Sequence, residues 1–325
     1  MKILITGDSG FIGSFSTKKL QAEGFEINGI DIDPQKKYPV DYPYIVGNIL
    51  DAKALERCMQ GVECIIHLAA EHKDFGISKE QYYAVNQHGM ETLLSAANKF
   101  GIKKILFFSS VVVYGDHQPS NELTEPSPIN HYGASKLAGE KVLRQWAEEN
   151  NERSAVILRP VVVFGPSNKA NIYRLIKMVC DKKFIWIGDG KVVKSIAYVE
   201  NIVDAALFLL NKMKTGIDVF NYSDEPHLTT ERLVQLIAQK AKVKVPKFKI
   251  PLAPVQAVTR LFDVFAAITK KDIPITSARI LKFNTATEHH SSKIREMGFQ
   301  SQYSIDYGIE QYVRWYFEDK KNTAR

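Results

Sequence analysis

The chain has 325 residues, 45% of them hydrophobic, which is enough for a sizeable core in one large domain or two smaller ones. Its net charge of +7 suits an anionic substrate or surface, but no basic patch interleaved with aromatic residues predicts nucleic-acid binding. Residues 1–5 lack the features of a signal peptide and no apolar run approaches the ~20 residues that span a bilayer, so we expect a cytoplasmic protein.

The first predicted element is a buried strand over residues 2–6, followed by a glycine-rich turn and a helix that reaches residue 20. In dinucleotide-binding proteins, glycines in such a turn let the backbone approach the pyrophosphate, and the helix N-terminus attracts that anion. The expected cofactor contacts are Gly7, Gly10, Phe11, Ile12 and Gly13. An ordinary glycine-rich loop remains the alternative for this motif taken alone.

The second predicted strand, over residues 26–31, ends in Asp31, 18 residues after Gly13. A carboxylate at this place accepts hydrogen bonds from the adenosine ribose and repels the 2′-phosphate of NADP. No Arg or Lys follows Asp31 directly, so we expect NAD as the cofactor. Asp33 is a weaker candidate for the same role.

Three further short strands are predicted over residues 44–46, 64–67 and 104–108, with the alternation of strands and helices that is typical of a parallel sheet. Ligands of such sheets bind outside the carboxyl ends of the strands. Residues that follow these strands are therefore expected to line the adenosine and ribose, although plain turns are the alternative. They are Asn48, Ile49, Leu68, Ala69 and Ala70.

Tyr132 and Lys136 open a predicted helix over residues 131–150. Residues four apart lie on one helix face, so both side chains can act on one ligand. A free tyrosine has a pKa of about 10, and a nearby ammonium lowers that pKa toward the range of a useful base. Ser110 follows a strand end and can hydrogen-bond the substrate. A solvated helix face is the alternative for the Tyr-x-x-x-Lys pair alone.

Taken together, these motifs resemble those of the extended short-chain dehydrogenases/reductases, over most of the first 250 residues. The matching segments are Thr6-Gly7-x-x-Gly10-Phe11-Ile12-Gly13, His67-Leu68-Ala69-Ala70, Asn86, residues 109–115, Tyr132-Gly133-x-Ser135-Lys136 and residues 158–166.

The resemblance implies an α/β fold with a Rossmann-type doubly wound parallel sheet. Residues 1–166 would form the NAD-binding domain, and residues 167–325 a smaller, mixed substrate-binding region with segments that return to the first domain. The implied catalytic residues are Ser110, Tyr132 and Lys136. Further implied contacts of the cofactor are Asn86, which would order the site, Ser109, Pro160 and Val161, together with Tyr132 and Lys136.

Residues 69–74, 130–133 and 194–201 resemble more closely the bacterial enzymes that epimerise N-acetylglucosamine on undecaprenyl diphosphate. This likeness extends over residues 273–287. It implies the interconversion of lipid-linked GlcNAc and GalNAc through a 4-keto sugar, for surface polysaccharide synthesis such as O-antigen or capsule.

Single residues distinguish between this reaction and other reactions of the family. A UDP-glucose or UDP-GlcNAc 4-epimerase is the main alternative. A 4,6-dehydratase needs an Asp-Glu pair where this chain has Val111-Val112. A 4-keto-sugar reductase would consume NADPH, against which Asp31 argues, and a non-catalytic dinucleotide sensor would not need both Tyr132 and Lys136.

The expected substrate contacts come from scattered positions. They are His72, Ser110, Asn171, Lys194 and Arg279. By resemblance, cations at the last two positions hold a diphosphate. UDP-sugar enzymes commonly have Arg where this chain has Lys194, and lysine lacks the bidentate fork of arginine. The carrier of the sugar, lipid or UDP, therefore stays open.

Two interaction surfaces are also predicted. Residues 252–269 have apolar residues at helical spacing between basic flanks, which suits either peripheral contact with a membrane or packing on the protein's own core. By resemblance, the helices over residues 83–100 and 131–150 would pair with their copies in a homodimer.

The cysteines and histidines give no sign of a metal site. Cys58, Cys64 and Cys180 lack Cys-x-x-Cys spacing and are expected to be buried or unused thiols in a reducing compartment. His289 and His290 are adjacent, and we expect both at the surface.

Overall fold

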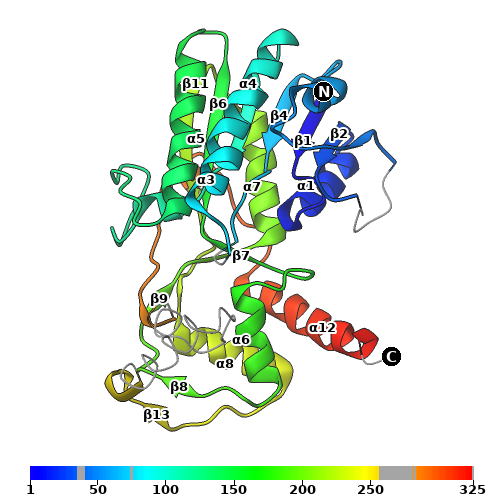
Figure 1. Cartoon of the computed structure of the whole chain (residues 1–325). Coiled ribbons are helices and arrows are strands. Elements are labelled where there is room, and N and C mark those ends of the chain that lie inside the picture. The colour runs from blue at the N-terminus through cyan, green and yellow to red at the C-terminus, as the bar shows by residue number, and fades with distance from the viewer. Residues whose placement is uncertain (35–40, 74–75, 256–280, 282, 324–325) are drawn as a thin grey trace. The chain divides into compact units, whose positions relative to one another are not determined.

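The computed structural model describes residues 1–34, 41–73, 76–255, 281 and 283–323, which divide into two compact units (Figure 1). Unit 1 consists of Met1–Val163, Val199–Ser223 and His289–Gln302. Unit 2 consists of Phe164–Tyr198, Tyr303–Arg325 and the segment Asp224–Glu288, each in its described part. The second half of the chain thus contributes to both units.

Unit 1 is built on a seven-stranded parallel sheet with the strand order β11-β6-β5-β4-β1-β2-β3. The strands are β1 (Lys2–Thr6), β2 (Glu26–Asp31), β3 (Tyr44–Val46), β4 (Cys64–His67), β5 (Lys104–Phe108), β6 (Ser154–Pro160) and β11 (Gly216–Tyr222). The central strands are short apolar runs, as expected of strands that are covered on both faces. The predicted strands and the doubly wound sheet are confirmed.

Helices flank this sheet. The helices α2 (Ala52–Cys58), α4 (Gly89–Lys99) and α5 (His131–Glu148) share one core with the sheet, to which Leu55, Leu93 and Leu143 contribute (Figure 1). The helices α1 (Phe11–Ala22) and α7 (Val199–Lys212) contact each other and the strands β1, β2 and β6. These two sets of helices pack on the strands and hold them in place. The candidate site lies at the carboxyl ends of the strands.

Shorter elements complete unit 1. They are α3 (Lys79–Tyr83), a π-helical turn η1 (Ala84–His88), a 3-10 turn η2 (Val111–Tyr114) and α11 (Ser292–Glu296). The strand β7 (Val162–Phe164) contains the boundary between the units.

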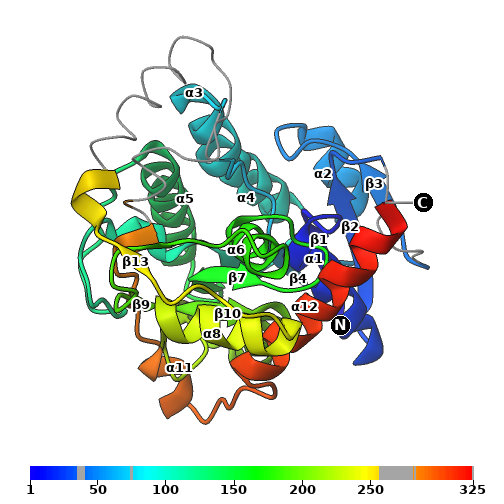
Figure 2. The same cartoon turned by 90° about the horizontal axis from the view of Figure 1, so that it is seen from below.

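Unit 2 is smaller and mixed, as predicted. Its helices α6 (Asn171–Cys180), α8 (Thr230–Ala241) and α12 (Ile305–Thr323) pack on one another (Figure 2). Its strands are β8 (Trp186–Ile187), β9 (Val193–Lys194), β10 (Ile196–Tyr198), β12 (Leu228–Thr229) and β13 (Lys249–Ile250). The strand β9 pairs with β12, and β8 pairs with β13.

Burial in the structure tests several predictions about single side chains. Cys58, Cys64 and Cys180 are buried free thiols, and burial raises the pKa of each to about 12, which confirms that they are inert. The surface position expected for His289 is wrong, because this side chain is 4% exposed and its Nδ1 lies 2.7 Å from the hydroxyl of Ser120. Within the described residues no helix has the length and apolarity to cross a membrane.

Candidate active site

The glycine-rich turn after β1 is closed so tightly that side chains are excluded from it. Gly7 has a φ of +74°, in the left-handed region, and its N–H donates to the carbonyl of Ile30 at 2.8 Å. A Cβ on Gly7 would lie 2.7 Å from the backbone nitrogen of Ala69, and a Cβ on Gly13 would lie 2.2 Å from the carbonyl oxygen of Gly7. Both glycines are therefore required by the close backbone contacts.

The first turn of α1 fits an anion. Gly10 is the N-cap, no side chain caps the helix, and its first turn holds no acidic residue. The leading N–H groups of a helix have no partner within the helix and carry partial positive charge. Phe11 and Ile12 supply these groups next to Gly13, which is the arrangement that holds a pyrophosphate.

Acidic side chains lie beside the glycine turn, at the end of β2. Asp31 accepts hydrogen bonds from the N–H of Ser9 and the N–H of Asp33, each at 3.1 Å. The buried Asp8 accepts the hydroxyl of Tyr42 at 2.6 Å, and burial followed by this bond raises the pKa of that phenol. The negative charge here opposes a 2′-phosphate, in line with NAD rather than NADP.

The predicted adenosine contacts differ in exposure. The carbonyl of Thr6 accepts a hydrogen bond from the N–H of Leu68 at 3.0 Å, and the hydroxyl of Thr6 accepts one from the N–H of Ala69 at 3.3 Å. The loop after β4, which continues into the partly exposed Ala70, therefore borders the glycine turn. Asn48 is exposed and accepts the N–H of Leu50 with its side chain. Ile49 is 5% exposed and its side chain belongs to the core beneath α4.

The helix α5 carries Tyr132 and Lys136, and the side chain of Lys136 reaches the end of β5. Asn130 caps the helix by accepting the N–H of Gly133 at 2.8 Å, which fixes where the helix starts. Lys136 is 1% exposed, and its Nζ donates to the carbonyl of Phe108 at 2.7 Å. The solvated helix face is therefore excluded for this lysine.

Burial changes the chemistry of Lys136. It lowers the pKa of the ammonium to about 7, which the charge of Glu140 only partly offsets. The Nζ also lies 4.2 Å from the centre of the Phe107 ring. Ser110 follows on the same strand end, is 8% exposed, and accepts the N–H of Val112 with its hydroxyl at 3.3 Å. The buried Lys136 and the hydroxyl of Ser110 thus both belong to the carboxyl end of β5.

Asn86 orders the site from the π-helical turn η1. Its amide donates to the carbonyl of Glu71 at 3.0 Å and to the hydroxyl of Ser135 at 2.9 Å, and its oxygen accepts the N–H of Glu71. The side chain thus ties the loop after β4 to α5. His72, in that loop, is exposed.

The other predicted residues lie as follows. The hydroxyl of Ser109 donates to Glu140 at 2.5 Å. Pro160 and Val161 are buried at the end of β6, where Val161 donates to the carbonyl of Tyr222. In unit 2, Asn171 is the exposed first residue of α6, and Lys194 donates to the carbonyl of Thr285 at 2.5 Å. Arg279 lies outside the described residues, as does most of the segment 252–269.

Some residues of the site were missed by sequence reasoning. His67 stacks on Phe107 and contacts the hydroxyl of Thr6 at 2.7 Å. Burial and the charge of Lys136 lower the pKa of His67 to about 3, so it stays neutral and is no acid at the site. Glu140 follows Lys136 by one helical turn, and this spacing is the signal that would have found it.

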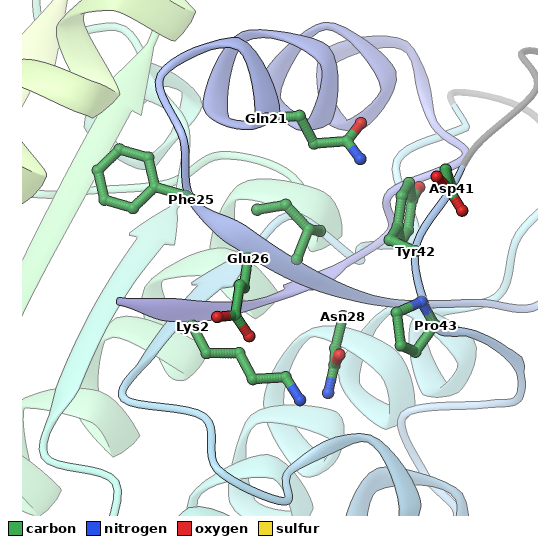
Figure 3. A pocket seen from close by; sticks show the side chains of 9 residues that line it. Lys2, Gln21, Phe25, Glu26, Asn28, Asp41, Tyr42 and Pro43 are labelled. Carbon is green, nitrogen blue, oxygen red and sulfur yellow. The ribbon is translucent and has the colours of Figure 1, made fainter.

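A polar pocket in unit 1 is not the nucleotide site. Figure 3 shows Lys2 and Glu26, the first residues of β1 and β2, on its wall together with Tyr42. It therefore opens near the amino ends of these strands, whereas the glycine turn follows their carboxyl ends.

Comparison with known proteins decides the family. The profile of the NAD dependent epimerase/dehydratase family matches residues 3–222, more than half of the chain. The chain belongs to this NAD-dependent epimerase/dehydratase family. Its cofactor is NAD, and the close backbone contacts of the glycine turn and the carboxylate of Asp31 are compatible with that cofactor.

Three known proteins show what this chain is similar to. It is 35% identical to the N-acetyl-α-D-glucosaminyl-diphospho-ditrans,octacis-undecaprenol 4-epimerase of Escherichia coli O157:H7, over 98% of this chain and 96% of the relative. It is 30% identical to the UDP-glucose 4-epimerase of Lactobacillus helveticus, over 68% of this chain and 76% of the relative. The crystal structure of the UDP-glucose 4-epimerase of Thermotoga maritima has the same fold, with a TM-score of 0.80 at 23% identity and coverage of 98% and 100%.

Gly13→Ala tests the cofactor cradle. The new Cβ forces the Gly7 carbonyl to move, so NAD binding should weaken by about tenfold or more, which corresponds to about 1.4 kcal/mol. The measurement is the NAD released per chain after denaturation of the purified protein. Ser14→Ala, in the same turn of α1, is the control and should keep its NAD. Full retention of NAD by Gly13→Ala would contradict the assigned cradle.

Lys136→Met tests the buried ammonium through its pH dependence. The pKa of Lys136 is 10.5 in the unfolded chain and about 7 in the folded protein. The free energy of unfolding of the wild type therefore rises with pH between these two values. The Tm of Lys136→Met relative to wild type should therefore be highest near pH 7 and decline toward pH 10, measured on protein without NAD. The exposed Lys141→Met is the control, and its Tm difference should stay constant. A constant difference for Lys136→Met would exclude the lowered pKa.

Proposed function

We propose that this chain is an NAD-dependent 4-epimerase that interconverts GlcNAc and GalNAc joined to undecaprenyl diphosphate. One observation carries the reaction type: the buried Nζ of Lys136 reaches the end of β5, one helical turn from Tyr132 and beside Ser110. This arrangement supports Tyr132 as a base and Ser110 as a hydrogen-bonding group in the oxidation and reduction of a secondary alcohol.

The residues divide the proton chemistry between them. Tyr132, as the phenolate favoured by the neighbouring ammonium, takes the proton of the C4 hydroxyl. Ser110 hydrogen-bonds the same oxygen and keeps it in place while its bond order changes. NAD supplies the hydride chemistry at C4 when bound. After the 4-keto sugar presents its other face, Tyr132 returns the proton, so the product differs only at C4.

Dehydration is disfavoured by the turn that follows Ser110. A 4,6-dehydratase by resemblance needs an acid pair at this place. The first two residues of the turn η2 are instead Val111 and Val112, of which Val111 is 6% exposed. Neither valine can protonate a leaving hydroxyl, which supports epimerisation as the outcome.

The lipid-linked substrate is supported by the extent of similarity. The relative named for undecaprenyl-linked GlcNAc matches 98% of this chain at 35% identity, whereas the UDP-glucose 4-epimerase of L. helveticus matches 68%. The additional coverage includes residues beyond the family profile, where the substrate carrier is expected to bind. Lys194, with a single ammonium in place of an arginine fork, is compatible with a simple diphosphate.

A surface of unit 2 supports contact with the membrane that holds such a substrate. Lys249 pairs with Trp186 in the parallel pair β8–β13, so Phe248 lies next to Ile185. These two side chains are 75% and 56% exposed. Exposed lysines precede them, namely Lys182, Lys183 and Lys247. Exposed apolar side chains with exposed cations close by in the sequence suit the interface of an anionic phospholipid bilayer.

The substrate proposal is tested by offering the purified protein UDP-GlcNAc and polyprenyl-diphospho-GlcNAc separately. We expect the C4 epimer from the lipid-linked sugar, detected by chromatography of the released monosaccharides. Tyr132→Phe should lower this turnover by about 100-fold or more while the protein keeps its NAD, because only the proton-transferring hydroxyl is lost. Conversion of the UDP sugar alone would replace the proposal by a UDP-sugar 4-epimerase.

The membrane surface is tested by flotation of the protein with liposomes that contain phosphatidylglycerol. Wild type should float, and Lys247→Glu should bind more than about fivefold more weakly, because losing the lysine costs about 1 kcal/mol and the new carboxylate repels the anionic lipid. Lys212→Glu, an equally exposed lysine on α7, is the control for net charge. Wild-type protein that stays at the bottom of the gradient, or equal losses in both variants, would refute this surface.

A further inference from the structure

Glu140 is a buried carboxylate of unit 1 to which the proposed chemistry gives no direct role. It follows Lys136 by one turn on α5, so both side chains leave the same face of the helix. Glu140 is 0% exposed. A carboxylate withdrawn from water is tolerated only where charges and hydrogen bonds compensate it. The partners of Glu140 therefore define what this position holds together.

Both oxygens of Glu140 have partners from other elements. Arg159 on β6 donates from Nη2 to Oε2 at 2.5 Å and from Nε to Oε1 at 2.9 Å. The hydroxyl of Ser109, directly after β5, donates to the same Oε1 at 2.5 Å. Burial alone would lower the pKa of the Arg159 guanidinium, but the hydrogen bond and charge of Glu140 raise it, so the ion pair persists.

The network continues from Arg159 into the turn η2. Nη1 of Arg159 donates to the hydroxyl of Tyr114 at 2.8 Å, and the guanidinium carbon lies 4.9 Å from the centre of the Tyr114 ring. The same hydroxyl donates to Oδ1 of Asn221 on β11 at 2.8 Å. One ion pair thus joins α5, the end of β5, η2 and two further strands.

Ser110 lies between the two anchored residues of this network. Ser109 precedes it and is bound to Glu140, while Tyr114 ends the turn that Ser110 caps and is bound to Arg159. Both ends of the segment 109–114 are therefore attached to the helix that carries the catalytic tyrosine and lysine. A small displacement of this segment would change the distance between Ser110 and the phenol.

We propose that Glu140 is a positioning residue for Ser110. Through Ser109 and Arg159 it fixes the strand end relative to the reactive face of α5. The proposal rests on the proposed function, in which Ser110 acts with the side chains of that face. A misplacement by about 1 Å costs on the order of 100-fold in rate, so a role in positioning appears in kcat more than in substrate binding.

Ser109→Ala is the decisive variant, because it removes one link and leaves the Glu140–Arg159 pair intact. In the full-length protein with NAD added to saturation, we expect kcat to fall by about 10- to 100-fold, with the KM for the sugar unchanged. Ser154→Ala is the matched control, a buried serine at the opposite end of the sheet, and should keep wild-type kcat. Unchanged kcat in Ser109→Ala at saturating NAD would overturn the proposal.

A double-mutant cycle separates positioning from general stability. If Ser109 acts through Ser110, then adding Ser109→Ala to Ser110→Ala should lower kcat no further, because the positioned hydroxyl is already absent. A structural defect would instead multiply the two losses, and that result would overturn the proposal. The sugar substrate for the cycle is whichever of the two the wild type converts.

Amide hydrogen exchange keeps this test independent of the proposed function. If wild type converts neither sugar, the proposed function fails, but the peptide that covers residues 109–115 still reports on the network. Exchange there should be faster in Ser109→Ala than in wild type or Ser154→Ala. Equal protection in all three proteins would show that Glu140 does not hold this segment.

Discussion

The buried ammonium of Lys136 is the constraint around which the site is arranged. A charge withdrawn from water needs partners, and Lys136 has the carbonyl of Phe108 and the face of Phe107. Both belong to β5, so the helix that carries the lysine is held at the carboxyl end of this strand. The same desolvation brings the pKa of the lysine to about 7.

The parallel sheet brings the other parts of the site to that edge. The strands β5, β4, β1 and β2 are neighbours and run in the same direction. The glycine turn, the loop of Ala69 and Ala70, Asp31 and Ser110 therefore all lie at the carboxyl ends of these strands. The sequence separates these groups widely, and only strand pairing makes them neighbours. NAD would bind with its adenosine ribose beside Asp31 at the end of β2 and its nicotinamide beside β5, which matches the direction in which a dinucleotide binds across such an edge.

Local patterns predicted much of this arrangement, and non-local contacts account for the rest. Gly7, Gly13 and Asp31 could be identified because their function depends on spacing within one strand–turn–helix unit. The burial of His289 could not, since it depends on Ser120, 169 residues away. The network of Glu140 likewise depends on partners from separate strands. Residues 199–223 join the first unit although residues 164–198, which precede them, belong to the second, and apolar periodicity does not reveal this.

The return of the chain to unit 1 has a consequence for biosynthesis. β11, the last strand of the sheet, is made more than fifty residues after β6, with which it pairs along seven positions. Until β11 leaves the ribosome, β6 is an open and strongly apolar edge, the kind that recruits foreign strands. A nascent or truncated chain that stops within the intervening residues therefore leaves this edge of the sheet open to aggregation.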